Sequence, residues 1–89
     1  AGLFGLAASL SQELAPEVTV NSIATGWMDW TPGRGADDPA ENLLLRFIPM
    51  RSFGGAESLG ALAVLLASDA AGFLSGQVFR VDGGVSAHL

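Results

Sequence analysis

Two short segments with strand character, separated by a helix, constrain the fold of this chain most. Residues 18–23 alternate, with β-branched side chains on one parity, and run into Thr25-Gly26, which predicts a strand that ends in a turn. Residues 77–81 predict a second strand, closed by the turn residues 82–84. A strand, a helical crossover and a second strand imply parallel neighbours with a right-handed connection. The chain is therefore expected to be an α/β protein with two parallel strands.

Two longer helices are predicted from apolar residues at helical spacing. Four leucines recur along residues 1–15, before Pro16 ends the helix: Leu3, Leu6, Leu10 and Leu14. Residues 56–67 have a wider apolar surface, made of Leu59, Leu62, Ala63, Leu66 and Ala67, with Val64 and Leu65 beside them. A helix of this kind is expected to be buried on most of its sides.

The stretch from Trp27 to Phe53 is the least regular part of the sequence, and a short helix is expected inside it. Asp38 fits the N-cap of this helix, followed by a proline at the first position and Glu41 in a capping box. An apolar stripe follows before Pro49 ends the helix: Leu43, Leu44, Phe47 and Ile48. The predicted order is helix, strand, loop, helix, strand.

The length and the apolar content together predict a thin core and a partner. A chain of 89 residues forms one unit at most, and it buries a smaller share of its surface than a larger domain does. Yet 49% of its residues are hydrophobic and only 15% are charged. Apolar surface that a small monomer cannot hide is usually covered by another subunit or by the remainder of a larger domain, so a homo-oligomer is expected.

Charge and cysteine content exclude several classes of function. The net charge is −5, and the four basic residues are arginines scattered singly, so nucleic acid is not an expected partner. The chain has no cysteine, which excludes a disulfide, a thiolate zinc site and a cysteine nucleophile and leaves the cytoplasm as the default location. Its uncharged runs are shorter than the roughly 18 residues of a membrane span, so no membrane partner is expected.

Three segments resemble the short-chain dehydrogenase/reductase family. Residues 18–26, Val-Thr-Val-Asn-Ser-Ile-Ala-Thr-Gly, are similar to the family's Val-x-Val-Asn-x-Ile-x-Pro-Gly segment. Leu-Ala-Ser-Asp at 66–69, Phe-Leu-Ser-Gly-Gln at 73–77 and Val-Asp-Gly-Gly at 81–84 resemble its last helix, turn and strand. Residues 1–16 resemble the helix that directly follows the family's Tyr-x-x-x-Lys pair. The match covers nearly the whole chain and implies a partial Rossmann-like unit, residues 1–89, from the family's carboxy-terminal half.

The resemblance implies NAD or NADP as the cofactor and an oxidoreductase that acts on a carbonyl or alcohol. In the family a tyrosine is the general acid/base, and a nearby lysine lowers its pKa. This chain has neither residue type, and residues 33–38 do not complete the glycine-rich Gly-x-Gly-x-x-Gly loop that holds the pyrophosphate. The segment is therefore expected to be incompetent alone. The alternative is a free-standing small protein that acts as an oligomerising or binding module.

The resemblance also implies cofactor-binding residues, although no catalytic residue. The family's backbone contacts to the nicotinamide carboxamide map to Thr25, Gly26 and Met28, with threonine replacing the usual proline. The family's pyrophosphate-binding threonine falls at Trp30, so that contact is in doubt, and Thr31 comes one place late. Residues 27–53 correspond to the substrate-covering segment, in which five apolar side chains suit an apolar substrate: Trp27, Trp30, Leu44, Phe47 and Ile48.

Several of these residues have a structural interpretation beside the functional one. Large aromatics next to a strand end, here Trp27 and Trp30, are more often core or subunit contacts than substrate walls. Asn21 within an apolar strand is expected to bond to backbone. Acids at a helix start serve as caps, so no metal is expected at Asp37, Asp38 and Glu41. His88 is expected to be a solvated tail residue, and Arg51 and Arg80 surface charges.

Overall fold

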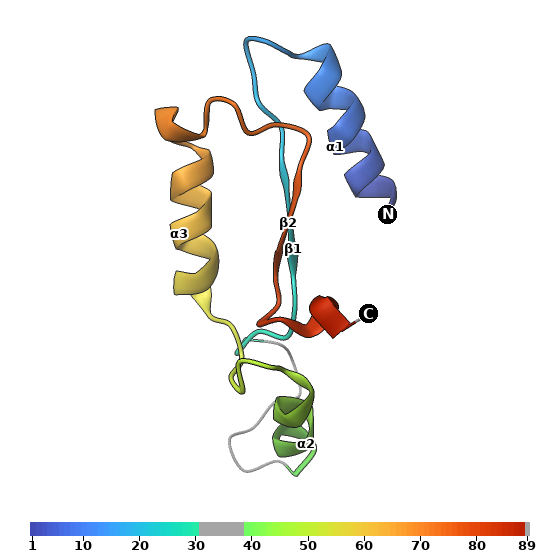
Figure 1. The fold of residues 1–89 in the computed structure, drawn as a ribbon, viewed down its shortest axis with the longest axis vertical. Helices are drawn as coiled ribbons and strands as arrows, with labels where there is room; N and C mark the ends of the chain where they lie inside the picture. The colour runs from blue at the N-terminus through green and yellow to red at the C-terminus, as the bar shows by residue number, and fades with distance from the viewer. Residues whose placement is uncertain (31–38, 89) are drawn as a thin grey trace.

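A computed structural model describes residues 1–30 and 39–88 of the chain. The elements follow in the order α1 (Gly2–Glu13), β1 (Ser22–Thr25), α2 (Pro39–Phe47), α3 (Ala56–Leu66), η1 (Asp69–Ala71), β2 (Val78–Val81) and η2 (Val85–His88), where η is a 3-10 helix. α1 and α3 flank the strand pair, and α2 lies beyond its far end, near the carboxy terminus (Figure 1). The predicted order of helix, strand, loop, helix and strand is confirmed.

β1 and β2 pair in parallel, as the crossover predicted. Ser22 is opposite Val78 at one end of the ladder, and Thr25 is opposite Val81 at the other. β1 begins later than the expected residue 18, because the segment before β2 is not extended where it would have to pair with residues 18–21. In that segment Gly76 has φ 74°. The Gly76 N–H instead donates to the Val20 carbonyl oxygen at 2.7 Å, a turn contact outside the ladder.

Asn21 joins this turn to the start of β1. Its side-chain amide donates to the Leu74 carbonyl oxygen at 2.9 Å. Its side-chain oxygen accepts the Gln77 N–H at 3.1 Å. One asparagine thus satisfies two backbone groups of the segment that leads into β2, which confirms the expected backbone-bonding role.

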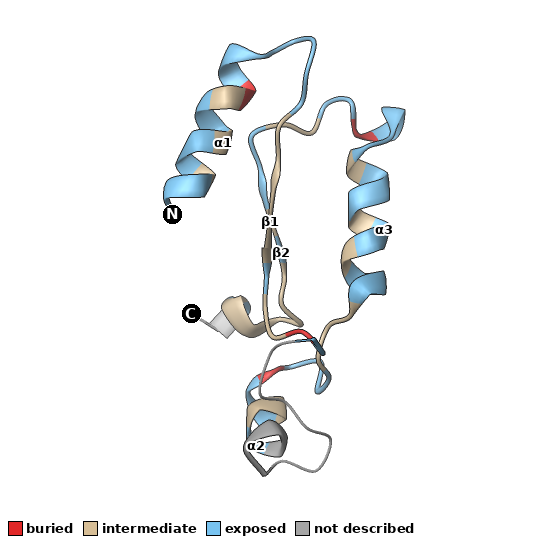
Figure 2. Cartoon of the chain, turned by 180° about the vertical axis from the view of Figure 1, so that it is seen from behind, coloured by how far each residue is buried: buried red, intermediate tan, exposed pale blue. Residues whose placement is uncertain are grey.

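The predicted burial of the helix over residues 56–67 is wrong within this chain. No side chain of α3 is buried, and Val64 is 71% exposed. On α1, Leu3 is 72% exposed, and the buried residue is Ser11. Figure 2 shows both helices with largely exposed surfaces. The physical reason is that each helix has the small strand pair on one side and no described element of the chain over the other.

Within the described ranges, the buried apolar side chains are few, and they lie in two places: the segments on either side of α2, and η1 after α3. Among the described residues, the buried apolar side chains are Met28, Ile48 and Ala71. Met28 forms an isolated parallel bridge with Gly54, and a Cβ built on Gly54 would lie 2.6 Å from the Met28 sulfur. The expectation of a thin core is confirmed.

α2 is the short helix expected within the irregular stretch. Its predicted N-cap, Asp38, lies outside the described residues. The predicted apolar stripe is divided: Ile48 is 2% exposed, whereas Phe47 is exposed to solvent. The Arg51 guanidinium donates to the carbonyl oxygens of Arg46 and Leu45, so this arginine caps the last turn of α2 besides carrying a surface charge.

Candidate functional site

The turns that follow the two parallel strands meet at one edge of the sheet. The Gly26 N–H donates to the Val81 carbonyl oxygen at 2.9 Å, which continues the pairing beyond the ladder. A Cβ built on Gly26 would lie 2.8 Å from both Cα and Cβ of Asp82. Carbon atoms do not approach so closely without repulsion, so only glycine fits here. Residues 25–28 and 82–84 are called below the β1 turn and the β2 turn.

A hollow of about 370 Å³ opens where these turns meet, and we call it the strand-end hollow. It is lined by Thr25, Gly26, Trp27, Asp82 and Val85. Open α/β sheets bind ligands at this place, outside the carboxyl ends of their strands. Its size is at the lower end of the range for ligand pockets, which is about 300–1,000 Å³.

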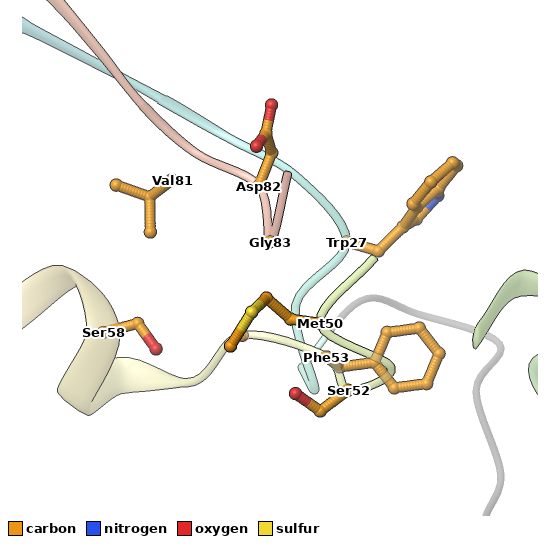
Figure 3. Close-up of a pocket in the computed structure, with 9 residues that line it drawn as sticks. Trp27, Met50, Ser52, Phe53, Ser58, Val81, Asp82 and Gly83 are labelled. Atoms are coloured by element: carbon orange, nitrogen blue, oxygen red, sulfur yellow. The ribbon is translucent and has the colours of Figure 1, made fainter. Parts of the chain in front are cut away.

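A smaller hollow of about 170 Å³ lies on the other side of the β2 turn. Its lining comes from the segment after α2, the start of α3 and the end of β2: Trp27, Met50, Ser52, Phe53, Gly54, Ser58, Val81, Asp82 and Gly83. In Figure 3 the Asp82 carboxylate points away from Met50 and Ser52. Trp27 and Asp82 line both hollows.

The structure brings two of the three predicted cofactor-binding residues together. Thr25 ends β1 and is exposed, and Gly26 follows it into the lining of the strand-end hollow. Met28 is 2% exposed, and its side chain packs on Gly54 instead of lining the hollow. Only the Met28 backbone remains for a ligand contact of the kind that the resemblance implies.

Asp82 is the site residue that sequence reasoning missed. Its carboxylate accepts the Gly84 N–H at 3.0 Å on one oxygen and the Ser86 N–H at 3.2 Å on the other. The Ser86 hydroxyl, these two N–H groups and the Arg80 charge hold the pKa of Asp82 below its ordinary value of 3.8, against the opposing effect of desolvation. The sequence Asp-Gly-Gly indicates a turn at this place, but the same tripeptide is common in turns without a functional role.

The β2 turn also carries the segment that leaves α2. Gly83 and Gly84 have φ 65° and 95°, a conformation that side-chain-bearing residues rarely adopt. The Met50 N–H donates to the Gly83 carbonyl oxygen at 3.1 Å. A Cβ built on Gly83 would lie 2.7 Å from Cγ2 of the buried Ile48. The glycines thus permit close contact between the β2 turn and the end of α2.

The two tryptophans are not core residues, which corrects one part of the structural expectation. Trp27 is half-buried beside both hollows, and Trp30 is 53% exposed. Both follow the carboxyl end of β1 in the sequence. His88 is the last residue of η2, and the expectation that this histidine is a solvated tail residue stays a prediction.

The charges that line the strand-end hollow restrict the ligand groups that it suits. The five lining residues include one carboxylate and no cationic side chain, so they do not complement a pyrophosphate. Residues 1–30 and 39–88 contain no group of three acids or histidines that could hold a metal ion. Asp37 and Asp38 lie outside the described residues.

No helix in the described part of the chain is long and apolar enough to cross a membrane.

Comparison with known proteins defines the class. A family model described as enoyl-(acyl carrier protein) reductase matches residues 1–86. The chain belongs to this family of short-chain dehydrogenases/reductases, and its fold is a partial Rossmann unit.

Individual relatives align with nearly the full length of this chain. The 3-oxoacyl-[acyl-carrier-protein] reductase FabG of Chlamydia trachomatis is 34% identical over 87 residues, 97% of this chain and 35% of that protein. An Agrobacterium tumefaciens protein solved with bound NADP has a TM-score of 0.86 and 35% identity, over 97% of this chain and 36% of the other. A 4-hydroxyisoleucine dehydrogenase complexed with NADH has a TM-score of 0.88 and 25% identity, over 97% and 37%. The chain therefore spans about a third of the length of the relatives it matches.

Proposed function

We propose that residues 1–89 form one partial unit, the carboxy-terminal segment of an NAD(P)-dependent oxidoreductase that acts on a carbonyl or alcohol. The observation that carries the proposal is the strand-end hollow, which is built by two backbone turns in direct contact at the carboxyl ends of parallel strands. In this proposal Thr25, Gly26 and Met28 form a wall of the nicotinamide site, the first two at the hollow and Met28 through its backbone. Trp27 covers the wall with apolar surface.

The residue types in the chain indicate which parts of the reaction these 89 residues can support and which they cannot. The nicotinamide supplies or accepts the hydride when it is bound. The chain has no tyrosine and no lysine, so the proton donor of the family's reaction has to come from outside these 89 residues. The β1 turn orients the ring, and the half-buried Trp27 restricts water beside it. Such a segment positions the cofactor and does not itself transfer a proton.

A chimera tests this proposal. The segment of the Chlamydia trachomatis FabG that aligns with this chain is replaced by residues 1–89, and binding of NADH and NADPH is measured by fluorescence, followed by turnover of a 3-oxoacyl thioester. We expect cofactor binding and reductase activity. The Gly26→Ala chimera should lose both through the clash with Asp82, whereas Gly5→Ala, where a Cβ meets no atom within 4 Å in this chain, should retain them. A folded chimera that binds neither cofactor would refute the proposal.

The alternative of a free-standing oligomerising or binding module gains no support from the comparisons. The family match extends across residues 1–86, and the named relatives are reductases or dehydrogenases. No described feature of the chain favours a binding function unrelated to theirs. The cytoplasmic location expected from the sequence stays a prediction.

Self-association is the second part of the proposal. Large apolar side chains are exposed on both long helices, among them Leu3, Leu6, Val64 and Leu65. Exposed apolar surface of this extent usually marks an interface. Native mass spectrometry of the chain should therefore show multiples of 9.1 kDa. A 9.1 kDa species alone at micromolar concentration would contradict it.

A further inference from the structure

We propose that Asp82 is a positioning residue that fixes the β1 turn and the end of α2 in one arrangement. The inference rests on the proposed function, because the β1 turn forms the proposed nicotinamide wall. Asp82 itself is not a catalytic residue, since its carboxylate is occupied by backbone groups of its own turn. Its effect on a bound cofactor is therefore indirect, through the backbone that it holds in place.

The first step is the contact between the two turns. The Gly26 backbone lies so close to Asp82 that a Cβ at Gly26 would be 2.8 Å from the Asp82 Cα. The Gly26 N–H also donates to the Val81 carbonyl oxygen, one residue before Asp82. A shift of the Asp82 backbone therefore shifts the β1 turn with it.

The second step is the anchoring of Asp82 itself. Its two carboxylate oxygens accept two different N–H groups, from Gly84 and Ser86. The Val85 N–H donates to the Asp82 carbonyl oxygen at 3.3 Å, which closes the turn that leads into η2. A carboxylate that accepts two backbone N–H groups fixes the path of residues 82–86 more firmly than a neutral side chain can.

The third step is the link to α2. Gly83 accepts the Met50 N–H, and its backbone lies against Ile48. Pro49 lies against Gly84, where an added Cβ would be 3.2 Å from the proline ring. The end of α2 thus rests on the β2 turn that Asp82 organises. In the family, the segment that includes α2 covers the substrate, so one carboxylate holds the cofactor side and the substrate side together.

Amide hydrogen exchange in the full chain tests this inference without any bound cofactor. Asp82→Asn leaves one oxygen to accept and places an amide where the second N–H points. We expect exchange of the Gly84 and Ser86 amides to accelerate by roughly tenfold or more, as for loss of a hydrogen bond to a charged group. The Gly26 and Met50 amides should accelerate with them. The Ala67 amide, bonded at the end of α3, is the internal reference and should not change.

Two further variants keep the outcome decisive. Asp69→Asn removes an aspartate charge at η1 and should leave all these amides unchanged. If Asp82→Asn unfolds the chain, Ser86→Ala replaces it, because it removes the hydroxyl and retains the backbone N–H; a smaller acceleration at the Gly26 and Met50 amides is then expected. Acceleration confined to residues 82–86 would overturn the inference, since it would show a local role only.

The chimera separates this inference from the proposed function. In an active chimera Asp82→Asn should raise the KM for cofactor and substrate together by several-fold while kcat changes less, and Asp69→Asn should alter neither. An unchanged KM for both would overturn the functional part of the inference. If the chimera with Asp82 intact binds no cofactor, the proposed function fails, while the exchange rates of the Gly26 and Met50 amides still decide whether Asp82 couples the two turns.

Discussion

Replacing Gly26 by alanine is the perturbation whose effect the structure defines most closely. The added Cβ would lie 2.8 Å from the Asp82 Cα, about 0.7 Å or more inside the usual carbon–carbon separation of about 3.5–4.0 Å. The obstructing atom belongs to the backbone, so a change of rotamer cannot relieve the overlap. Overpacking of this kind costs about 1–3 kcal/mol, and the lower entropy of the unfolded alanine chain returns about 0.4–1 kcal/mol. A net loss of about 1–2 kcal/mol in the free energy of unfolding is expected.

Gly60→Ala is the matched control with the opposite expected sign. Gly60 lies inside α3, and a Cβ there would meet no atom within 4 Å. Alanine should therefore stabilise the helix by about 0.5–1 kcal/mol. Urea unfolding of both variants, followed by far-ultraviolet circular dichroism, measures the difference. Trimethylamine N-oxide in the buffer raises the starting stability, so that a loss from a small core stays measurable. A Gly26→Ala chain as stable as Gly60→Ala would refute the reasoning about the contact between the turns.

Three further outcomes follow from individual side chains. Asn21→Ala removes two hydrogen bonds to the segment before β2 and should lower the free energy of unfolding by about 1–3 kcal/mol, measured by urea titration; a loss confined to faster exchange of the Gln77 amide would contradict a global role. The carboxyl of Asp82 should titrate below pH 3.8 in a carbon-detected NMR experiment. Because its pKa is lowered on folding, its stabilising contribution is complete above the unfolded pKa and is lost as the pH falls through the folded value, and a midpoint above 3.8 would refute the hydrogen bonding described. Val64→Ser, at a 71% exposed position, should leave monomer stability within about 0.5 kcal/mol but weaken self-association in native mass spectra, and an unchanged oligomer would exclude the outer face of α3 from the interface.

The sequence predicted the connectivity well because connectivity depends on local signals. Alternation, turn residues and helical spacing located the strands and helices, and the crossover rule then gave the parallel pairing that β1 and β2 show. The start of β1 was placed too early because the ladder also needs an extended partner, and Gly76 at φ 74° interrupts it. Alternation along one strand carries no information about the other.

Burial and the role of Asp82 could not be predicted in the same way. Spacing shows which face of a helix is apolar, but not whether an element of the same chain covers it, and Val64 remains exposed for that reason. Thr25 and Gly26 were predicted as site residues from the family resemblance, and they line the strand-end hollow. Asp82 was not, because its importance depends on contact with Gly26, which is distant in the sequence.

The contact between the β1 turn and the β2 turn has a consequence for exchanging parts between members of the family. A relative with a bulkier residue at the position of Gly26 must have a differently placed backbone at the position of Asp82, because the two share the same space. If only one of the two turns is grafted from a relative, its backbone does not match the turn that it has to contact. Residues 25–28 and 82–86 should be transferred as a single unit when cofactor or substrate preference is redesigned.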